Sequence, residues 1–186
     1  FLGFADYLGI DKKMCFDLRF DKSNDITLNS GQRVDTDTAY IVLNLGASQG
    51  NKVWSNKGYE ETAAWCLDNG FNVILVGDKD SYERAARIQV KKVINTVMKE
   101  GYALDLENFA RLALRAQAVV SPDTGLLHLA DAAGAKVIGL YGPTSPVKYA
   151  PYNNKKSVIS RHTSDQNVQN ITAGEVIKNL EMVVQQ

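Results

Sequence analysis

Short apolar runs alternate with amphipathic segments along the chain from residue 40 onward. The runs are rich in Val, Ile and Leu and cover residues 40–45, 72–76, 93–94, 118–120 and 137–141, with a weaker run at 157–159. Continuous apolar runs of this length are typical of strands that are covered on both faces of a parallel sheet. We therefore expect parallel strands at these positions.

The segments between the runs carry helical signals. Apolar residues recur at helical spacing from Tyr59 to Leu67, where Asn69 and Gly70 end the pattern, and again after Asp105. Residues 80–83 resemble a helix start, residues 124–133 form a short apolar helix, and the 172–175 segment has the T-x-x-E pattern of a capping box. This alternation predicts an α/β fold, a Rossmann-like parallel sheet with helices on both faces. Ligands of such sheets bind beyond the carboxyl ends of the strands.

The first 38 residues lack this rhythm. They combine a short apolar start with a polar, Asp-rich stretch, so we interpret residues 1–38 as a linker-like segment and residues 39–186 as one domain. A chain of 186 residues is long enough to bury a core without disulfides or metals.

Charge and composition narrow the classes of function. Lys plus Arg and Asp plus Glu both number 21, so the chain lacks the basic excess of a nucleic-acid-binding protein. No apolar run approaches the roughly 18 residues of a membrane span. The two cysteines, Cys15 and Cys66, have no metal-ligand spacing, and Cys66 falls in an apolar helical pattern where it is expected to pack as a small hydrophobe. These features favour a cytoplasmic protein without a metal site.

The most informative segment reads VVSPDTGLLH over residues 119–128. A strand ends, and a helix opens at Asp123 or Thr124, with Gly125 allowing close backbone approach. A helix start presents free N–H groups and partial positive charge, which suit a phosphate. Thr124 and His128 are four residues apart and share a helix face. The alternatives are a plain helix-capping role for Asp123 and a partly buried structural role for His128.

The loop after the first strand reads GASQGNKVW over residues 46–54. Its glycines, small residues and Lys52 could wrap a phosphate, although the spacing differs from a Walker loop. The same loop matches G-x-S-x-G, with Ser48 as the nucleophile of a serine hydrolase and His128 or His162 as its base. That motif turns directly into a helix, whereas helical periodicity here resumes only near residues 55–59. Trp54 is expected to be a core anchor.

Two further loops follow strands. After residue 76, the carboxylates of Asp78, Asp80 and Glu83 are candidates to hold ribose hydroxyls, and helix capping explains Asp80 equally well. After residue 141, a rigid Gly-Pro-Thr-Ser-Pro turn carries the hydroxyl of Thr144. The chain has no G-x-G-x-x-G, which disfavours a nicotinamide or flavin dinucleotide.

Three stretches carry a family resemblance. NLGASQGNKVW, NVILVGDKDSYERA and AQAVVSPDTGLLHLADAAGAKVIGLYGPTSP follow one another in the order and spacing of glycosyltransferase family nine, the lipopolysaccharide core heptosyltransferases and their relatives. The resemblance covers roughly residues 40–150 and is most specific over 117–146. It implies the C-terminal, donor-binding half of a GT-B glycosyltransferase, whose two Rossmann-like domains face each other across a cleft.

The resemblance also implies an activity and its residues. Family members transfer a sugar from an ADP-heptose-like nucleotide sugar to the lipopolysaccharide core, with inversion and without a metal or other cofactor. Lys52, Thr124 and Gly125 would hold the donor diphosphate, with Asp123 and His128 beside them. Ser48, Thr144 and a carboxylate among Asp78, Asp80 and Glu83 would make further donor contacts. The implied enzyme is cytoplasmic, and its full-length form associates peripherally with the inner membrane.

This chain departs from the family pattern in two respects. It lacks the N-terminal half that brings the acceptor site and the Asp general base, so the present chain alone is expected to be inactive. Leu45 replaces the usual proline before the Gly-Ala-Ser turn. A carboxylate beside a phosphate repels it, so we expect the charge of Asp123 to be held by N–H groups of its own turn or by a sugar hydroxyl. A non-catalytic nucleotide-binding module is the remaining alternative.

Overall fold

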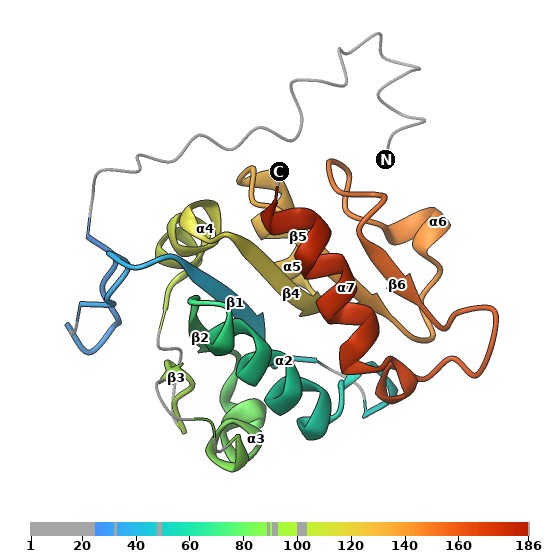
Figure 1. Ribbon diagram of the computed structural model, residues 1–186, viewed down its shortest axis with the longest axis horizontal. Helices are drawn as coiled ribbons and strands as arrows, with labels where there is room; N and C mark the ends of the chain where they lie inside the picture. Colours follow the sequence, from blue (N-terminus) through green and yellow to red (C-terminus); the bar gives the residue numbers. More distant parts are fainter. Residues whose placement is uncertain are drawn as a thin grey trace, which may run out of the picture.

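A six-stranded parallel sheet forms the centre of the molecule (Figure 1). The computed structural model describes residues 25–31, 33–47, 50–88, 90, 93–99 and 104–185. The strands are β1 (Tyr40–Asn44), β2 (Asn72–Val76), β3 (Val93–Asn95), β4 (Ala118–Pro122), β5 (Val137–Tyr141) and β6 (Val158–Ser160). Their order is β3-β2-β1-β4-β5-β6, and every neighbouring pair is parallel. The predicted strands are thus confirmed to within two residues.

Helices cover both faces of this sheet, as the alternating pattern predicts. One face carries α2 (Asn56–Asp68), α3 (Tyr82–Arg87) and α7 (Ala173–Val184), and the other carries α4 (Leu106–Arg115) and α5 (Gly125–Ala132). Figure 1 shows α2 and α7 side by side on the near face. The connections contain one-turn elements: η2 (Gly50–Lys52), η3 (Lys79–Ser81), α6 (Pro146–Tyr149) and η4 (Val168–Asn170).

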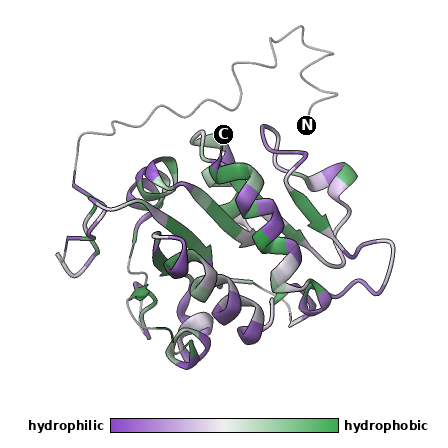
Figure 2. Ribbon diagram, in the orientation of Figure 1, coloured by the Kyte–Doolittle hydropathy of each residue, from purple (hydrophilic) through white to green (hydrophobic). Residues whose placement is uncertain are grey.

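The two faces of the sheet build two separate apolar clusters. Ile41 and Leu43 of β1 point to the side of α2 and α7, whereas Tyr40 and Val42 point to the side of α4 and α5. Successive strand residues face opposite sides, so a strand covered on both faces is apolar at nearly every position. In Figure 2 the hydrophobic colour fills the central strands, while α2 and α7 alternate between hydrophobic and hydrophilic positions.

Part of the N-terminal segment packs against the second cluster. Ile26 is fully buried and Val34 is 2% exposed, and the two are joined by a hydrogen bond from Val34 N to Ile26 O of 2.8 Å. Residues 1–24 lie outside the described residues, so the boundary at residue 38 stays a prediction. Residues 26 and 34 nevertheless belong to the packing unit of the domain.

Cys66 is fully buried in the first cluster, which confirms its predicted packing role. Burial raises the pKa of its thiol to about 12. Cys15 lies outside the described residues. Within the described ranges, no helix combines the length and the apolar character needed to cross a bilayer.

Candidate functional site

A cavity of about 910 Å³ opens at the carboxyl ends of the central strands. The chain runs from β1 outward through β2 and β3, and then returns to place β4 on the other side of β1. The strand order therefore reverses between β1 and β4, and open α/β sheets bind their ligands at such a reversal. Asn44 and Gly46 line the cavity from β1, Asp78 follows β2, and Thr124 and Gly125 follow β4.

The wall contributed by α4 and α5 is mostly apolar. Its side chains are Leu104, Leu106, Phe109, Leu126 and Leu129. The opposite rim carries the polar groups at the strand ends. A pocket with a broad apolar wall and a few convergent polar groups is typical of a small-molecule site.

Asn44, the last residue of β1, joins the parts of this rim. Its side chain is fully buried, and Nδ2 donates to Ser121 Oγ at 2.9 Å and to Thr124 Oγ1 at 3.1 Å. Its Oδ1 accepts from Gly46 N at 3.0 Å. Asn44 was not predicted as a site residue, because it lies at the end of an otherwise apolar strand run. An amide at the last position of a buried strand is the signal that could have revealed it.

The start of α5 is open toward the cavity. Thr124 is the N-cap residue, yet its side chain makes no capping hydrogen bond, and no described residue accepts a hydrogen bond from the N–H of Gly125 or Leu126. A Cβ built on Gly125 would meet no atom within 4 Å. The helix therefore presents its free N–H groups to open space, as the sequence predicts.

Lys52 lies at this helix start, as predicted. Its Nζ is 3.0 Å from Asp123 Oδ2, and His128 Nε2 is 3.4 Å from Asp123 Oδ1. The three side chains come from η2, from the end of β4 and from α5. Lys52, Asp123 and His128 do not line the cavity, but they adjoin it through Thr124 and Gly125, which do.

The carboxylate of Asp123 is held in its charged form. Burial alone would raise its pKa, but hydrogen bonds from His128, Thr144 and Lys52, together with the charge of Lys52, lower it to about 2. Of our two alternatives for this charge, the one with N–H groups of its own turn is wrong among the described residues, since the ammonium of Lys52 holds it. The alternative of a capping role for Asp123 is also wrong, because Thr124 is the N-cap residue.

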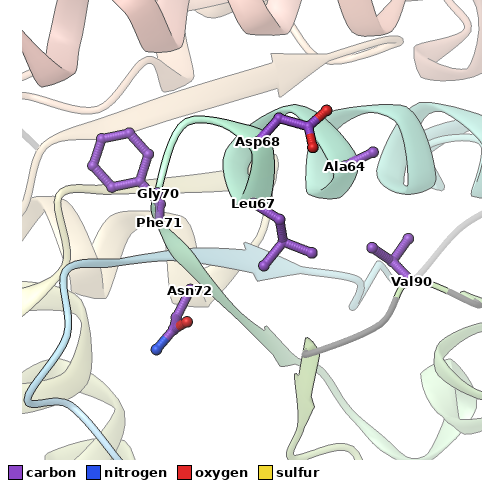
Figure 3. A pocket seen from close by; sticks show the side chains of 7 residues that line it. All are labelled: Ala64, Leu67, Asp68, Gly70, Phe71, Asn72 and Val90. Atoms are coloured by element: carbon purple, nitrogen blue, oxygen red, sulfur yellow. The ribbon is translucent and has the colours of Figure 1, made fainter.

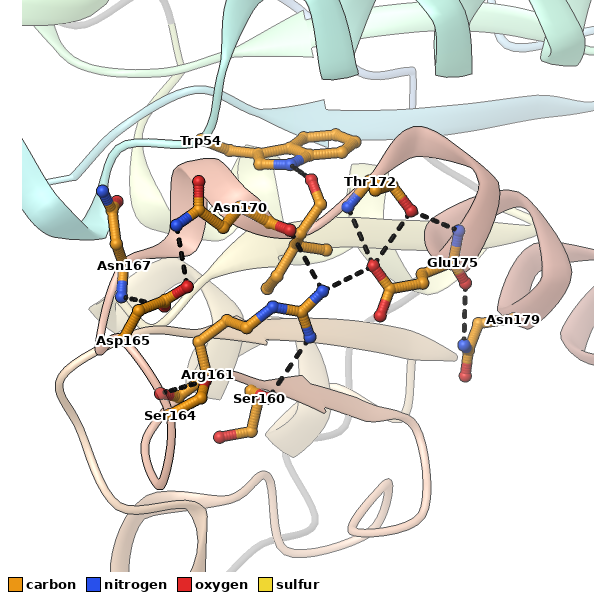
Figure 4. Close-up of polar contacts among 11 residues, drawn as sticks. Trp54, Ser160, Arg161, Ser164, Asp165, Asn167, Asn170, Thr172, Glu175 and Asn179 are labelled. Atoms are coloured by element: carbon orange, nitrogen blue, oxygen red, sulfur yellow. Dashed lines mark hydrogen bonds and ion pairs between the residues drawn. The ribbon is translucent and has the colours of Figure 1, made fainter.

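A network behind the site supports the turn that carries Lys52 (Figure 4). Trp54 is 1% exposed, which confirms it as a core anchor, and its Nε1 donates to Ile171 O at 2.7 Å. Arg161 Nη2 donates to Asn170 O at 3.0 Å and to Glu175 Oε2 at 2.6 Å. The segment from 161 to 172 is thereby fixed against α7, and through Trp54 it fixes the turn that carries Lys52.

Of the three carboxylates that were predicted as candidates to hold the ribose, only Asp78 lines the cavity. Asp78 lines the cavity, with its Oδ1 accepting from Ser81 N and Ser81 Oγ at 3.1 and 2.7 Å. Its other oxygen faces Gly46, because a Cβ on that glycine would lie 3.6 Å from Asp78 Oδ2. Asp80 and Glu83 are exposed and do not line the cavity. Thr144 Oγ1 is buried and has no hydrogen-bond partner of good geometry among the described residues, although Thr144 lowers the pKa of Asp123.

Ser48 lies outside the described residues, so its predicted contact stays a prediction. The start of α2 counts against the serine hydrolase. This helix begins only at Asn56, whereas the hydrolase motif turns directly into a helix. The rings of His128 and His162 make contacts with Asp123 Oδ1 and with Pro143 O, respectively. The described geometry therefore lacks the strand–turn–helix arrangement of a nucleophile elbow.

A second, smaller cavity of about 480 Å³ lies at the other end of the sheet (Figure 3). It is lined by residues such as Leu67, Phe71 and Val90, and by Asn72 at the amino end of β2. None of the predicted site residues lines it.

The fold is that of one half of a GT-B heptosyltransferase structure. The chain belongs to glycosyltransferase family 9 (heptosyltransferase), which it matches over residues 3–176. The predicted family and fold class are confirmed by this match and by the solved structures of relatives.

Curated and solved relatives agree with this assignment. The chain is 28% identical over 162 residues to the lipopolysaccharide core heptosyltransferase OpsX of Haemophilus influenzae, covering 86% of this chain and 46% of OpsX. Its structure resembles the E. coli heptosyltransferase WaaC with ADP, with a TM-score of 0.66 and 28% identity over 81% of this chain and 46% of WaaC. WaaC with ADP-2-deoxy-2-fluoro heptose gives a TM-score of 0.65 and 26% identity over 96% of this chain and 53% of WaaC. This chain thus spans about half of the length of these relatives.

Proposed function

We propose that this chain is the donor-binding half of an inverting, metal-independent glycosyltransferase that uses an ADP-heptose-like nucleotide sugar to build the lipopolysaccharide core. The observation that carries the proposal is the 3.0 Å contact between Lys52 and Asp123, which brings an ammonium group to the open start of α5 beside the cavity. WaaC, of whose length this chain covers about half, has been solved with ADP and with ADP-2-deoxy-2-fluoro heptose.

The chemistry of sugar transfer explains why these groups are needed. A sugar that leaves a diphosphate develops negative charge on the departing oxygen. Fixed dipoles and cations stabilise such charge, and the free N–H groups at α5 with the ammonium of Lys52 supply both. In the structure, the carboxylate of Asp123 is the anion that pairs with Lys52. Donor binding would draw Lys52 from Asp123 to the diphosphate, leaving Asp123 with His128.

The remaining contacts assign the other parts of the donor. Asp78 is the carboxylate that we expect to hold the ribose, because it lines the cavity whereas Asp80 and Glu83 do not. The apolar wall of the cavity is where we expect the nucleobase to pack. The general base and the lipopolysaccharide acceptor site belong to the other half of a family enzyme, so this chain alone is expected to bind donor without transferring sugar.

A calorimetric titration with ADP tests the proposal. Lys52→Ala should weaken ADP binding about 10- to 100-fold, the loss of one charge-assisted hydrogen bond. The matched control is Lys57→Ala, which removes an equal charge from a lysine on α2 whose side chain is 82% exposed. That variant should bind ADP within about twofold of the original chain, since it alters only an exposed surface charge.

Each outcome has a distinct meaning. If the unmodified chain does not bind ADP, the proposal is wrong. If Lys57→Ala weakens ADP binding as much as Lys52→Ala does, then Lys52 acts only through the overall charge of the chain and not through a contact with ADP. Sugar transfer in an enzyme that carries both family halves separates a glycosyltransferase from a non-catalytic nucleotide-binding module, and a fluorophosphonate probe that labels Ser48 would instead support the hydrolase.

A further inference from the structure

The amide of Asn44 has a fixed orientation at the end of β1. The backbone N–H of Gly46 can only donate, so the atom that faces it at 3.0 Å is Oδ1. The two hydrogens of Nδ2 therefore point to the hydroxyls of Ser121 and Thr124, at 2.9 and 3.1 Å. The side chain is fully buried and all three of its bonds stay within the rim of the cavity.

This orientation decides what the hydroxyl of Thr124 can do. Its oxygen accepts from Asn44, so the hydroxyl proton is left to be donated. The neighbouring Ser121 Oγ already donates to Pro122 O at 2.8 Å, and its contact with Thr124 Oγ1 is long, at 3.4 Å. Thr124 thus presents a hydrogen-bond donor at the start of α5, and a phosphate oxygen is an acceptor.

The same contact accompanies an uncapped helix start. In the described part of the chain, the other helices of eight residues or more have a side-chain cap, from Ser55 on α2, Asp105 on α4 and Thr172 on α7. Thr124 is of a residue type that normally accepts from the N–H groups of its own first turn. Here its oxygen is engaged by Asn44 instead, and the helix N–H groups remain free.

We propose that Asn44 is a positioning residue of the donor site, which holds Thr124 as a donor to the diphosphate and keeps the first turn of α5 open. The inference rests on the proposed function and extends it to a residue whose amide makes its three hydrogen bonds within the rim of the cavity. Asn44 acts from β1 on a residue 80 positions later in the chain.

The test measures ADP affinity and thermal unfolding for the same variants. Asn44→Ala removes both donors and should weaken ADP binding about tenfold, close to one lost hydrogen bond to a charged group. Asn44→Asp keeps the shape of the side chain, but its carboxylate can only accept hydrogen bonds. The hydroxyl of Thr124 should then donate to residue 44 instead of to ADP, and ADP binding should weaken at least as much as in Asn44→Ala. Should Asn44→Ala fail to fold, Asn44→Asp is combined with Thr124→Val, and an effect of Asn44→Asp that persists without the threonine hydroxyl would come from charge repulsion and overturn the inference.

Tyr40→Phe is the matched control. It removes another buried hydrogen bond, from Tyr40 Oη to Leu112 O at 2.7 Å, on the same strand but away from the cavity. We expect a loss of thermal stability with ADP affinity within about twofold of the original chain. Equal weakening of ADP binding in Tyr40→Phe and Asn44→Ala would show that Asn44 has only a structural role.

A double-mutant cycle tests whether Asn44 acts through Thr124. Once Thr124→Val has removed the hydroxyl, adding Asn44→Ala should weaken ADP binding by less than twofold more, because interacting residues are not additive. Full additivity overturns the inference. The outcomes also separate the two proposals: absence of ADP binding in the original chain overturns both, whereas loss in Lys52→Ala with normal binding in Asn44→Ala and Asn44→Asp overturns this inference alone.

Discussion

The starts of α5 and α7 both have threonine as the N-cap residue, yet their hydrogen bonds differ completely. At α7, Thr172 Oγ1 accepts from Glu175 N at 3.3 Å, while Thr172 N donates to Glu175 Oε2 at 2.9 Å (Figure 4). Arg161 binds the same carboxylate at 2.6 Å. At α5, Thr124 makes no capping bond and the first turn faces a cavity.

The difference comes from the partner of each threonine side chain: Thr124 Oγ1 accepts from Asn44 Nδ2 at 3.1 Å, whereas Thr172 forms a capping box with the residue three positions later. Glu175 can return a hydrogen bond to Thr172, whereas Leu127 cannot return one to Thr124. The closed helix start stabilises the fold, and the open one keeps N–H groups for an anion. A threonine at a helix start therefore indicates a helix boundary, but its other partners decide whether that boundary supports stability or binding.

The largest expected effect on stability concerns Asp123, directly before α5. Its pKa of about 2 lies below the ordinary 3.8, so its charge stabilises the folded state above pH 3.8, and this contribution is lost as the pH falls toward 2. Asp123→Asn should lower the free energy of unfolding at pH 7 by about 2 kcal/mol, with the difference from the original chain vanishing near pH 2. Urea unfolding across this pH range measures both effects.

Asp80→Asn is the control for that experiment, because Asp80 is an exposed carboxylate outside the cavity lining. We expect a change within about 0.5 kcal/mol. A pH-independent loss in Asp123→Asn would mean that its partners, rather than its charge, account for the effect.

Removing each threonine hydroxyl gives a direct test of the contrast between the two helices. Thr172→Ala should cost about 1 kcal/mol of stability, as for other N-cap residues, and leave ADP affinity within about twofold. Thr124→Ala should weaken ADP binding about tenfold, since it removes the donor that Asn44 positions. Paired thermal unfolding and calorimetry measure the two losses, and an equal effect of both substitutions on ADP affinity would contradict the distinction.

The smallest effect is expected at the capping carboxylate of α7. Burial alone would raise the pKa of Glu175, but hydrogen bonds from Arg161 and Thr172 outweigh it and hold the pKa below its ordinary value. Its stabilising contribution is therefore present above the ordinary 4.5 and is lost as the pH falls below it. Glu175→Gln should cost about 0.5 kcal/mol at pH 7, since the pair with Arg161 is partly exposed. Urea unfolding at pH 7 and at lower pH would detect the change, and a difference that grows on acidification would contradict this origin.

Much of the fold could be predicted because its elements have local signals. The buried parallel strands are nearly continuous apolar runs, so residues 72–76 and 137–141 were predicted with their observed bounds. The capping box at Thr172 and the helix after Asp105 were also predicted from local sequence patterns. The one-turn elements η2, η4 and α6 were not predicted, because a single turn has no periodicity to detect.

The candidate site was predictable in its residue types but not in its pairings. Lys52 and the start of α5 were expected together because both follow strands at one edge of the sheet. The ion pair with Asp123 joins residues 71 positions apart, and no local pattern encodes it. Asp78, Asp80 and Glu83 could not be told apart, since a helix start and a cavity rim favour the same side chains.

The bond between Trp54 and Ile171 has a consequence for the order in which the protein assembles. The turn that carries Lys52 is synthesised early, yet it packs on residues 168–170, and at Gly142 a Cβ would lie only 2.9 Å from Asn51 O and from Val168 N. The strands β1 and β2 can pair as they leave the ribosome, but this turn has no surface to rest on until more than a hundred further residues have been translated. A nascent chain halted before η4 would accordingly contain all six strands but lack the surface on which the turn that carries Lys52 rests.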